Sequence, residues 1–123
     1  MIKELLYPWE QHVLIKAIYD IRSETEESDD FKVQITRIIQ EIITNIVKHA
    51  NATQVTLHLK QTPNYLALYI SDNGKGYDVN KKSKGLGTKN IETRTQYLKG
   101  QYKVKSTLGK GTTNMFLFKN KLP

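Results

Sequence analysis

Ile70-Ser71-Asp72-Asn73-Gly74-Lys75-Gly76-Tyr77-Asp78 is the stretch on which the interpretation of the whole chain depends. Its apolar start predicts a strand that ends at Asp72, and Gly74 and Gly76 let the following backbone take a positive φ or pass close to a flat ligand. A carboxylate placed there can accept a hydrogen bond from an exocyclic amine such as adenine N6. The same pattern also occurs in an ordinary turn after a strand, so this stretch alone leaves both interpretations open.

Three other segments accompany it in a fixed order. A predicted helix upstream carries Glu41, Asn45 and Lys48, and two glycine segments follow downstream, at residues 85–87 and 109–112. The chain has seven glycines, all from Gly74 onward, and six of them fall in these three glycine segments. Unrelated turns do not explain such a concentration.

The polar residues of the upstream helix can converge on one ligand. At about 100° per residue, Glu41, Asn45 and Lys48 lie within roughly 60° of one another, beside an apolar arc of isoleucines. An amide oxygen such as that of Asn45 is a hard ligand that Mg²⁺ accepts while it also binds phosphate oxygens. Any amphipathic helix has a polar face, however, so it is the glycine segments that favour a binding role.

Taken together, the four segments resemble the N, G1, G2 and G3 boxes of the GHKL superfamily, whose ATP-binding (Bergerat) fold is shared by histidine kinases and gyrase. They are most similar to the catalytic (HATPase_c) domain of sensor histidine kinases of the nitrate/nitrite-sensor type. The matching patterns are Q-E-x-x-x-N-x-x-K-H-A at 40–50, D-N-G-x-G at 72–76, G-L-G-x-x-x-I-x-x-R at 85–94 and G-x-G-T at 109–112. The resemblance covers residues 30–118, which is most of the chain.

This resemblance implies a role for each matching residue. Asp72 would recognise adenine, Asn45 would coordinate Mg²⁺, and Lys48 would contact phosphate, with Glu41 as the catalytic residue that orients or deprotonates the acceptor. Further ATP contacts would come from His49, Gly74, Gly76, Tyr77, Gly85, Leu86, Gly87 and Thr112. Packing at the helix end is an equal alternative for His49, and β-propensity alone also explains Thr112.

The segment Tyr77 to Lys84 corresponds to the ATP lid of the resembling family. Its lysines, Lys81, Lys82 and Lys84, would meet phosphates or simply remain solvated. Gly85 and Gly87 precede a predicted helix at 88–99, and backbone amides at the amino end of a helix favour an anion.

Composition limits the class of protein. At 123 residues, the chain is expected to be one soluble ATP-binding domain, residues 1–123, that is long enough to bury a single core. The absence of cysteine excludes disulfides and thiolate metal sites and fits a cytoplasmic location. No apolar run approaches the roughly 18 residues of a membrane span, and the amino terminus does not resemble a signal peptide.

The net charge of +7 is compatible with several kinds of acidic or anionic partner. The basic residues lack the interleaved aromatics of a single-strand binder, so we do not expect nucleic acid contact. We also expect no membrane contact, because the chain has no apolar run long enough to span one.

The predicted fold is a two-layer α/β sandwich, in which a mixed, mostly antiparallel sheet of four or five strands has helices on one face. Strands are expected at 55–60, 65–71, 102–106 and 112–119, and helices at 30–50 and 88–99, the latter ending at Gly100. Residues 1–29 are expected to form an amino-terminal helix and an acidic loop, because Leu14, Ile18 and Ile21 have helical spacing. Residues 13–19 are also compatible with a strand.

In the resembling family, such a domain transfers the γ-phosphate of ATP to a histidine on a separate dimerisation domain, and a response regulator acts downstream. The chain's three histidines, His12, His49 and His58, all lie outside the family's phosphoacceptor motif. We therefore expect the chain to bind Mg²⁺-ATP but to lack its own acceptor. Two alternatives are a serine kinase of the anti-sigma type and a degenerate module that uses the fold only for protein contact.

Overall fold

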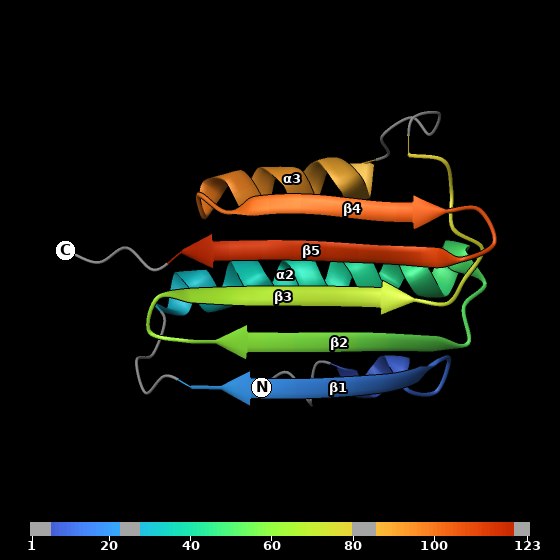
Figure 1. Ribbon diagram of the computed structural model, residues 1–123, viewed down its shortest axis with the longest axis horizontal. Coiled ribbons are helices and arrows are strands. Elements are labelled where there is room, and N and C mark those ends of the chain that lie inside the picture. The colour runs from blue at the N-terminus through green and yellow to red at the C-terminus, as the bar shows by residue number, and fades with distance from the viewer. Residues whose placement is uncertain (1–5, 23–27, 80–85, 120–123) are drawn as a thin grey trace.

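The described part of the chain forms a five-stranded sheet with its helices on one face (Figure 1). The structure, a computed structural model, describes residues 6–22, 28–79 and 86–119. The strands, in the spatial order β1-β2-β3-β5-β4, are β1 (Leu14–Ile21), β2 (Gln54–Gln61), β3 (Tyr65–Asp72), β4 (Gln101–Thr107) and β5 (Gly111–Lys119). β1 and β2 are parallel and the other neighbours are antiparallel, so the predicted mixed α/β sandwich is confirmed.

Two helices, α2 (Asp29–Asn45) and α3 (Leu86–Tyr97), cover the inner face of the sheet (Figure 1). The hydroxyl of Ser28 caps α2 by accepting a hydrogen bond from the Phe31 amide at 3.1 Å. The isoleucines of α2 recur at three- and four-residue intervals and are buried against the sheet. No helix among the described residues is both long and apolar enough to cross a membrane.

The core lies between α2 and the inner face of the central strands. Ile38, Ile39 and Ile43 on the helix are fully buried, as are Leu57 and Leu68 on β2 and β3. Because side chains alternate along a strand, the burial of Leu66, Leu68 and Ile70 places the next member of that series, Asp72, on the same inner face. The predicted β2–β3 hairpin is thus confirmed, and it delivers Asp72 to the end of the sheet.

The predicted amino-terminal helix is wrong. Residues 14–21 form β1, which pairs in parallel with β2 along its whole length, and only a three-residue 3₁₀ turn, η1 (Tyr7–Trp9), precedes it. Leu14 and Ile18, expected on the buried side of a helix, are 66% and 39% exposed. Backbone pairing of all eight strand residues outweighs the helical spacing of three apolar residues.

Two helix ends also differ from the sequence-based expectation. The helix predicted over 30–50 is α-helical only to Asn45, and residues 46–50 form a π-helical turn, η2 (Ile46–Ala50), which closes at Asn51 with a φ of 52°. At the end of α3, Lys99 rather than Gly100 takes the left-handed conformation, with a φ of 58°. Gly100 is needed for space instead, because a Cβ there would lie 2.4 Å from the Phe118 ring.

Candidate functional site

Asp72 is a buried carboxylate at the end of β3. Asp72 is 8% exposed, and its Oδ1 accepts a hydrogen bond from the Gly74 amide at 2.8 Å. Burial raises the pKa of the Asp72 carboxyl, and the amides of Gly74 and Thr112 oppose that rise. A carboxylate has about four acceptor positions, so Asp72 can still accept a hydrogen bond from a ligand amine.

The glycine that follows Asp72 is required by the protein itself. A Cβ on Gly74 would lie 2.3 Å from the backbone oxygen of Ala50, the last residue of η2. The amide of the next residue, Lys75, donates to that same oxygen at 2.8 Å. Gly74 therefore brings the end of the long helix directly against the loop after β3, which joins the N-box segment to Asp72.

Asn73 also has a structural role that the sequence did not indicate. Its Oδ1 accepts from the amides of Thr53 and Gln54 at 2.9 and 3.0 Å, and its Nδ2 donates to the Thr53 hydroxyl at 2.9 Å. These contacts fix the start of β2 to the end of β3. The Asn73 side chain therefore binds the protein itself, although it lies between Asp72 and Gly74, which the sequence predicts to contact the ligand.

A chain of hydroxyl contacts connects Tyr77 with the strand opposite Asp72. The Tyr77 amide donates to Ser106 Oγ at 2.8 Å, and Ser106 Oγ shares a hydrogen bond of 2.7 Å with the hydroxyl of Thr112. Thr112 stands directly opposite Asp72 in the β3–β5 register. Burial, followed by the negative charge of Asp72, raises the pKa of the Tyr77 hydroxyl. The first residue of the predicted lid is therefore anchored beside the carboxylate.

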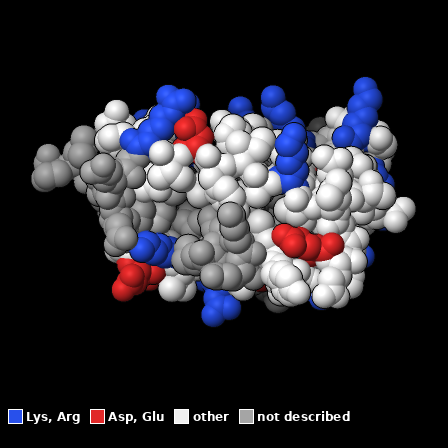
Figure 2. Space-filling view, turned by 90° about the horizontal axis from the view of Figure 1, so that it is seen from below, with Lys and Arg blue, Asp and Glu red and all other residues white. Residues whose placement is uncertain are grey.

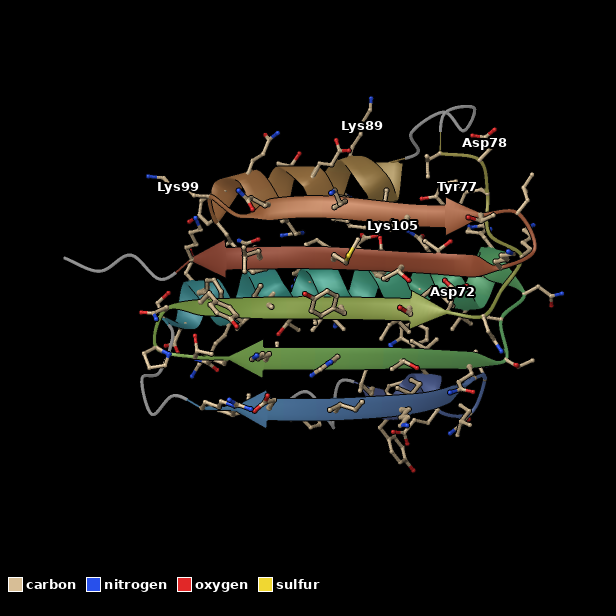
Figure 3. The ribbon with its side chains drawn as sticks, in the orientation of Figure 1. Asp72, Tyr77, Asp78, Lys89, Lys99 and Lys105 are labelled. Atoms are coloured by element: carbon tan, nitrogen blue, oxygen red, sulfur yellow. The ribbon has the colours of Figure 1, made fainter. Side chains whose placement is uncertain are left out.

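The labelled side chains show the same grouping in three dimensions. Asp72, Tyr77 and Asp78 lie at one end of the sheet, at the end where Lys89 marks the start of α3 (Figure 3). Lys99 lies at the other end of α3 (Figure 3). The carboxyl end of β3, the lid start and the amino end of α3 thus share one end of the molecule.

The polar stripe of α2 faces toward α3. Arg94 of α3 donates to Gln34 Oε1 at 2.9 Å, and the Tyr97 hydroxyl donates to Asp30 at 2.7 Å. Asn45 follows Gln34 by eleven residues, which is about three turns of a helix with 3.6 residues per turn, so the two share a face. Glu41 follows Gln34 by seven residues and lies on the same side. Asn45 and Glu41 therefore lie on the side of α2 that faces the G2-box helix.

The residues that the sequence predicts to contact ATP differ in their exposure, and some lie outside the described residues. Glu41, Asn45, Gly76, Tyr77 and Thr112 are half-buried, and Asp72 and Gly74 are buried. Lys48 and His49 are exposed in the π turn η2, where the α-helical projection used to align Lys48 no longer applies. Leu86 and Gly87 begin α3, while Gly85 and the lid lysines Lys81, Lys82 and Lys84 lie outside the described residues.

Sequence reasoning missed Ser106 as a member of this site. The alternation along β4 contained a signal for it, because Tyr102 and Ser106 are in register with the inner-face residues Phe116 and Thr112 of β5. A hydroxyl on the inner face next to a glycine turn is a candidate anchor. Arg94, the last residue of the G2-box pattern, packs α3 on α2 through its hydrogen bond to Gln34.

The donor set fits an ATP-binding site rather than a protein-only metal centre. Among the described residues, no group of three or more His, Asp or Glu side chains could hold a metal ion. A single amide oxygen from Asn45 suits a Mg²⁺ ion that keeps its waters and is bound mainly through phosphates.

Comparison with known proteins identifies the class. Residues 31–122 match the family described as histidine kinase-, DNA gyrase B-, and HSP90-like ATPase, so the chain belongs to this ATP-binding family. It is similar to the sensor protein VraS of Staphylococcus haemolyticus, with 36% identity over 118 residues, covering 90% of this chain and 32% of VraS. It is also similar to the histidine-protein kinase/phosphatase DegS of Bacillus subtilis, with 30% identity over 119 residues, covering 90% of this chain and 31% of DegS.

The chain is thus a histidine-kinase-type ATPase catalytic domain, and it spans about a third of the length of these relatives. Solved structures share its fold. A blue-light activated histidine kinase from Erythrobacter litoralis matches with a TM-score of 0.78 and 17% identity, covering 95% of this chain and 40% of that one. The mycobacterial sensor kinase MprB matches with a TM-score of 0.72 and 17% identity, covering 96% and 91%. Full-length ShkA, solved in complex with AMPPNP, matches with a TM-score of 0.69 and 19% identity, covering 94% and 27%.

Proposed function

We propose that this domain transfers the γ-phosphate of ATP to a histidine on a separate dimerisation domain, as part of a two-component system with a response regulator downstream. The observation that carries the proposal is Asp72. It is a buried carboxylate fixed at a sheet end, beside a helix whose polar stripe faces the G2-box helix. A purely structural sheet does not need a buried carboxylate with unused acceptor positions, because burial without compensation is costly.

The roles proposed for the other residues are those that the resemblance to the family implies. Asp72 would accept the adenine amine, Asn45 would hold Mg²⁺, and Lys48 would contact phosphate. Glu41 would orient or deprotonate the acceptor. Bound Mg²⁺ supplies the charge neutralisation that phosphoryl transfer requires, and the protein's part is to position the reacting groups. Gly76, Gly87 and the amino end of α3 would bring backbone amides to the phosphates.

The acceptor histidine would come from another polypeptide segment. His12 and His49 are exposed, and His58 points to the outer face of the sheet beside Tyr69. None is followed by the acidic residue of the family's acceptor motif. A cytoplasmic location and the nitrate/nitrite-sensor subtype stay predictions from the sequence.

Two other functions predict different outcomes. An anti-sigma-type serine kinase would share the fold and the ATP site but would phosphorylate serine. The names of the relatives VraS and DegS, a sensor protein and a histidine-protein kinase/phosphatase, favour histidine. A degenerate module would not respond to nucleotide at all.

Phosphotransfer to a separate polypeptide distinguishes the three. The chain is incubated with γ-labelled ATP, Mg²⁺ and a histidine-bearing dimerisation domain. A control reaction contains the same dimerisation domain with that histidine changed to alanine. We expect an acid-labile phosphate label on the dimerisation domain and no label on its histidine-to-alanine variant. Acid-stable label on serine would support the anti-sigma alternative, and the absence of both label and ATP-dependent stabilisation would support the degenerate module.

A further inference from the structure

The outer face of the sheet carries five lysines and no covering layer among the described residues. The helices lie behind the sheet in Figure 1, and the front face is open. Strand alternation and register place five lysines on this face: Lys16, Lys60, Lys103, Lys105 and Lys119. Figure 2, seen from the β1 side, shows Lys and Arg side chains along its upper margin, which is the edge of this face.

Acidic side chains are almost absent from the same face. The five strands contain two acidic residues, Asp72 on the inner face and Asp20 on the outer face. Asp20 is already engaged, because Arg22 Nε donates to its carboxylate at 2.9 Å. The outer face therefore presents an uncompensated positive potential, which attracts acidic partners.

The middle of this basic face is mostly apolar, with the His58 imidazole among the apolar side chains. Ile18, His58, Tyr69 and Met115 stand side by side on four neighbouring strands, and Lys103 ends the row on β4. Ile18 and Tyr69 are 39% and 42% exposed. The outer face of an antiparallel sheet that only meets water is normally polar, so an apolar row between lysines indicates a contact surface.

One end of the face is hollowed. A hollow of about 460 Å³ is lined by Tyr65, Ala67, Tyr69 and Leu117, with Lys60 and Lys119 also among its lining residues. This volume holds a large side chain, and the walls are apolar while the lysines supply positive charge. The matching group is an aromatic or apolar side chain flanked by carboxylates.

We propose that the outer sheet face docks an acidic partner polypeptide, which places an aromatic side chain in this hollow and carboxylates against Lys60 and Lys119. Ile18, Met115 and Leu117 offer aliphatic surface, which favours a polypeptide partner. A surface that binds a nucleic acid strand instead presents a series of exposed aromatic rings on which bases stack. Asp72 lies at the opposite end of β3 and on the other face, so docking and nucleotide binding would not compete.

The test uses fluorescein-labelled twelve-residue peptides in which glutamates surround either one phenylalanine or one serine. Binding is measured by fluorescence anisotropy near physiological salt. We expect the phenylalanine peptide to bind about tenfold more tightly than the serine peptide, because the phenylalanine ring fills the apolar hollow and the serine side chain does not. Amide resonances of Tyr69, Leu117 and Lys119 should shift on binding in an ¹⁵N NMR titration.

Charge-matched variants separate this site from the general positive charge. Lys60→Glu with Lys119→Glu should weaken the phenylalanine peptide by about tenfold or more. The control, Arg37→Glu with Lys99→Glu, removes the same charge from exposed positions on α2 and just after α3, away from the amino end of α3, and should stay within about twofold of the wild type. ATP-dependent stabilisation, retained in both variants, reports that they are folded.

Three results would overturn the proposal. One is an equal loss of affinity in the two double variants. Another is a set of resonance shifts away from the outer face. The third is tighter binding of a twelve-residue oligothymidine that depends on Lys60 and Lys119, which would make the face a nucleic-acid surface instead.

Discussion

At the scale of single residues, Asp72 is the side chain from which the site is built. The sequence alone predicted its place at a strand end, because the alternating apolar residues before it and the glycines after it both mark the boundary. The contacts of its neighbours could not be predicted in the same way. Asn73 and Ser106 act through partners on segments distant in sequence, and no local pattern specifies those partners.

The buried carboxylate predicts an unusual pH dependence for Asp72→Asn. The pKa of Asp72 in the folded state lies above the ordinary value of 3.8, so the folded state binds more protons between those two values. Stability from this group is therefore fully present at lower pH and is lost as pH rises through the raised pKa. We expect Asp72→Asn, without nucleotide, to become more stable relative to the wild type as pH rises above 3.8.

Urea unfolding of both proteins across this pH range measures the difference. A stability difference that stays constant with pH would contradict a raised pKa at Asp72. A gain in wild-type stability relative to Asp72→Asn as pH rises would mean that the pKa is lowered instead.

The hydroxyl of Ser106 is expected to matter for the lid start. In Ser106→Ala, the half-buried Tyr77 amide loses its acceptor, which should lower the free energy of unfolding by about 1–3 kcal/mol. ATP affinity should fall as well, because Tyr77 lies beside Asp72. Isothermal titration calorimetry and urea unfolding measure the two effects.

Ser71→Ala is the matched control for this change. Ser71 forms a similar hydroxyl contact of 3.0 Å with Thr113, but on the outer face of the sheet. We expect ATP affinity to be unchanged in Ser71→Ala. An equal loss of affinity in the two variants would show that the hydroxyl chain has no specific part in the site.

At the scale of elements, two glycines lie where the chain turns from β4 into β5, Gly109 in the turn and Gly111 as the first residue of β5, and each is required for a different reason. Gly109 and Gly111 have φ values of 80° and 86°, so both positions disfavour other residues. A Cβ on Gly111 would lie 2.0 Å from the Asp72 backbone oxygen, whereas a Cβ on Gly109 would meet nothing within 4 Å. Gly111 thus packs β5 against the end of β3, and Gly109 only shapes the turn.

Alanine at these two positions separates the backbone effect from the packing effect. Gly109→Ala should lower the free energy of unfolding by about 1–2 kcal/mol, the cost of a left-handed residue with a side chain. Gly111→Ala carries the same cost and also a clash with backbone, so it should be markedly more destabilising and should weaken ATP binding by displacing Asp72. Equal urea midpoints for the two variants would contradict this packing role.

The elements themselves were predictable where a strong local pattern and the tertiary contacts agree. The isoleucine periodicity specified α2, and alternation specified β2 and β3. The helix predicted at residues 14–21 was wrong because the spacing of their apolar residues suits a helix. Their actual partner, β2, lies across a long crossover connection and leaves no local signal. The π turn η2 also has no sequence signal, since it depends on how Ala50 meets Gly74.

At the scale of the whole molecule, the sheet separates two surfaces. Its inner face, at the carboxyl end of β3, gathers Asp72, Thr112 and the anchored Tyr77 beside the polar stripe of α2. Its outer face is basic and open. The fold could be inferred from four ordered motifs, and the same motifs predict the candidate site on the inner face. The outer face could not be inferred, because its lysines and apolar residues come together only through the register of five strands.

We propose that Asp72 and Asn45 bind opposite ends of one nucleotide, and calorimetric titration of ATP with Mg²⁺ and with EDTA tests this arrangement most directly. Wild type should bind more tightly with Mg²⁺ than with EDTA. Asp72→Asn should lose binding under both conditions, while Asn45→Ala should keep the EDTA affinity and lose only the gain from Mg²⁺. Wild-type affinity in Asp72→Asn, or a full Mg²⁺ gain in Asn45→Ala, would contradict the claim.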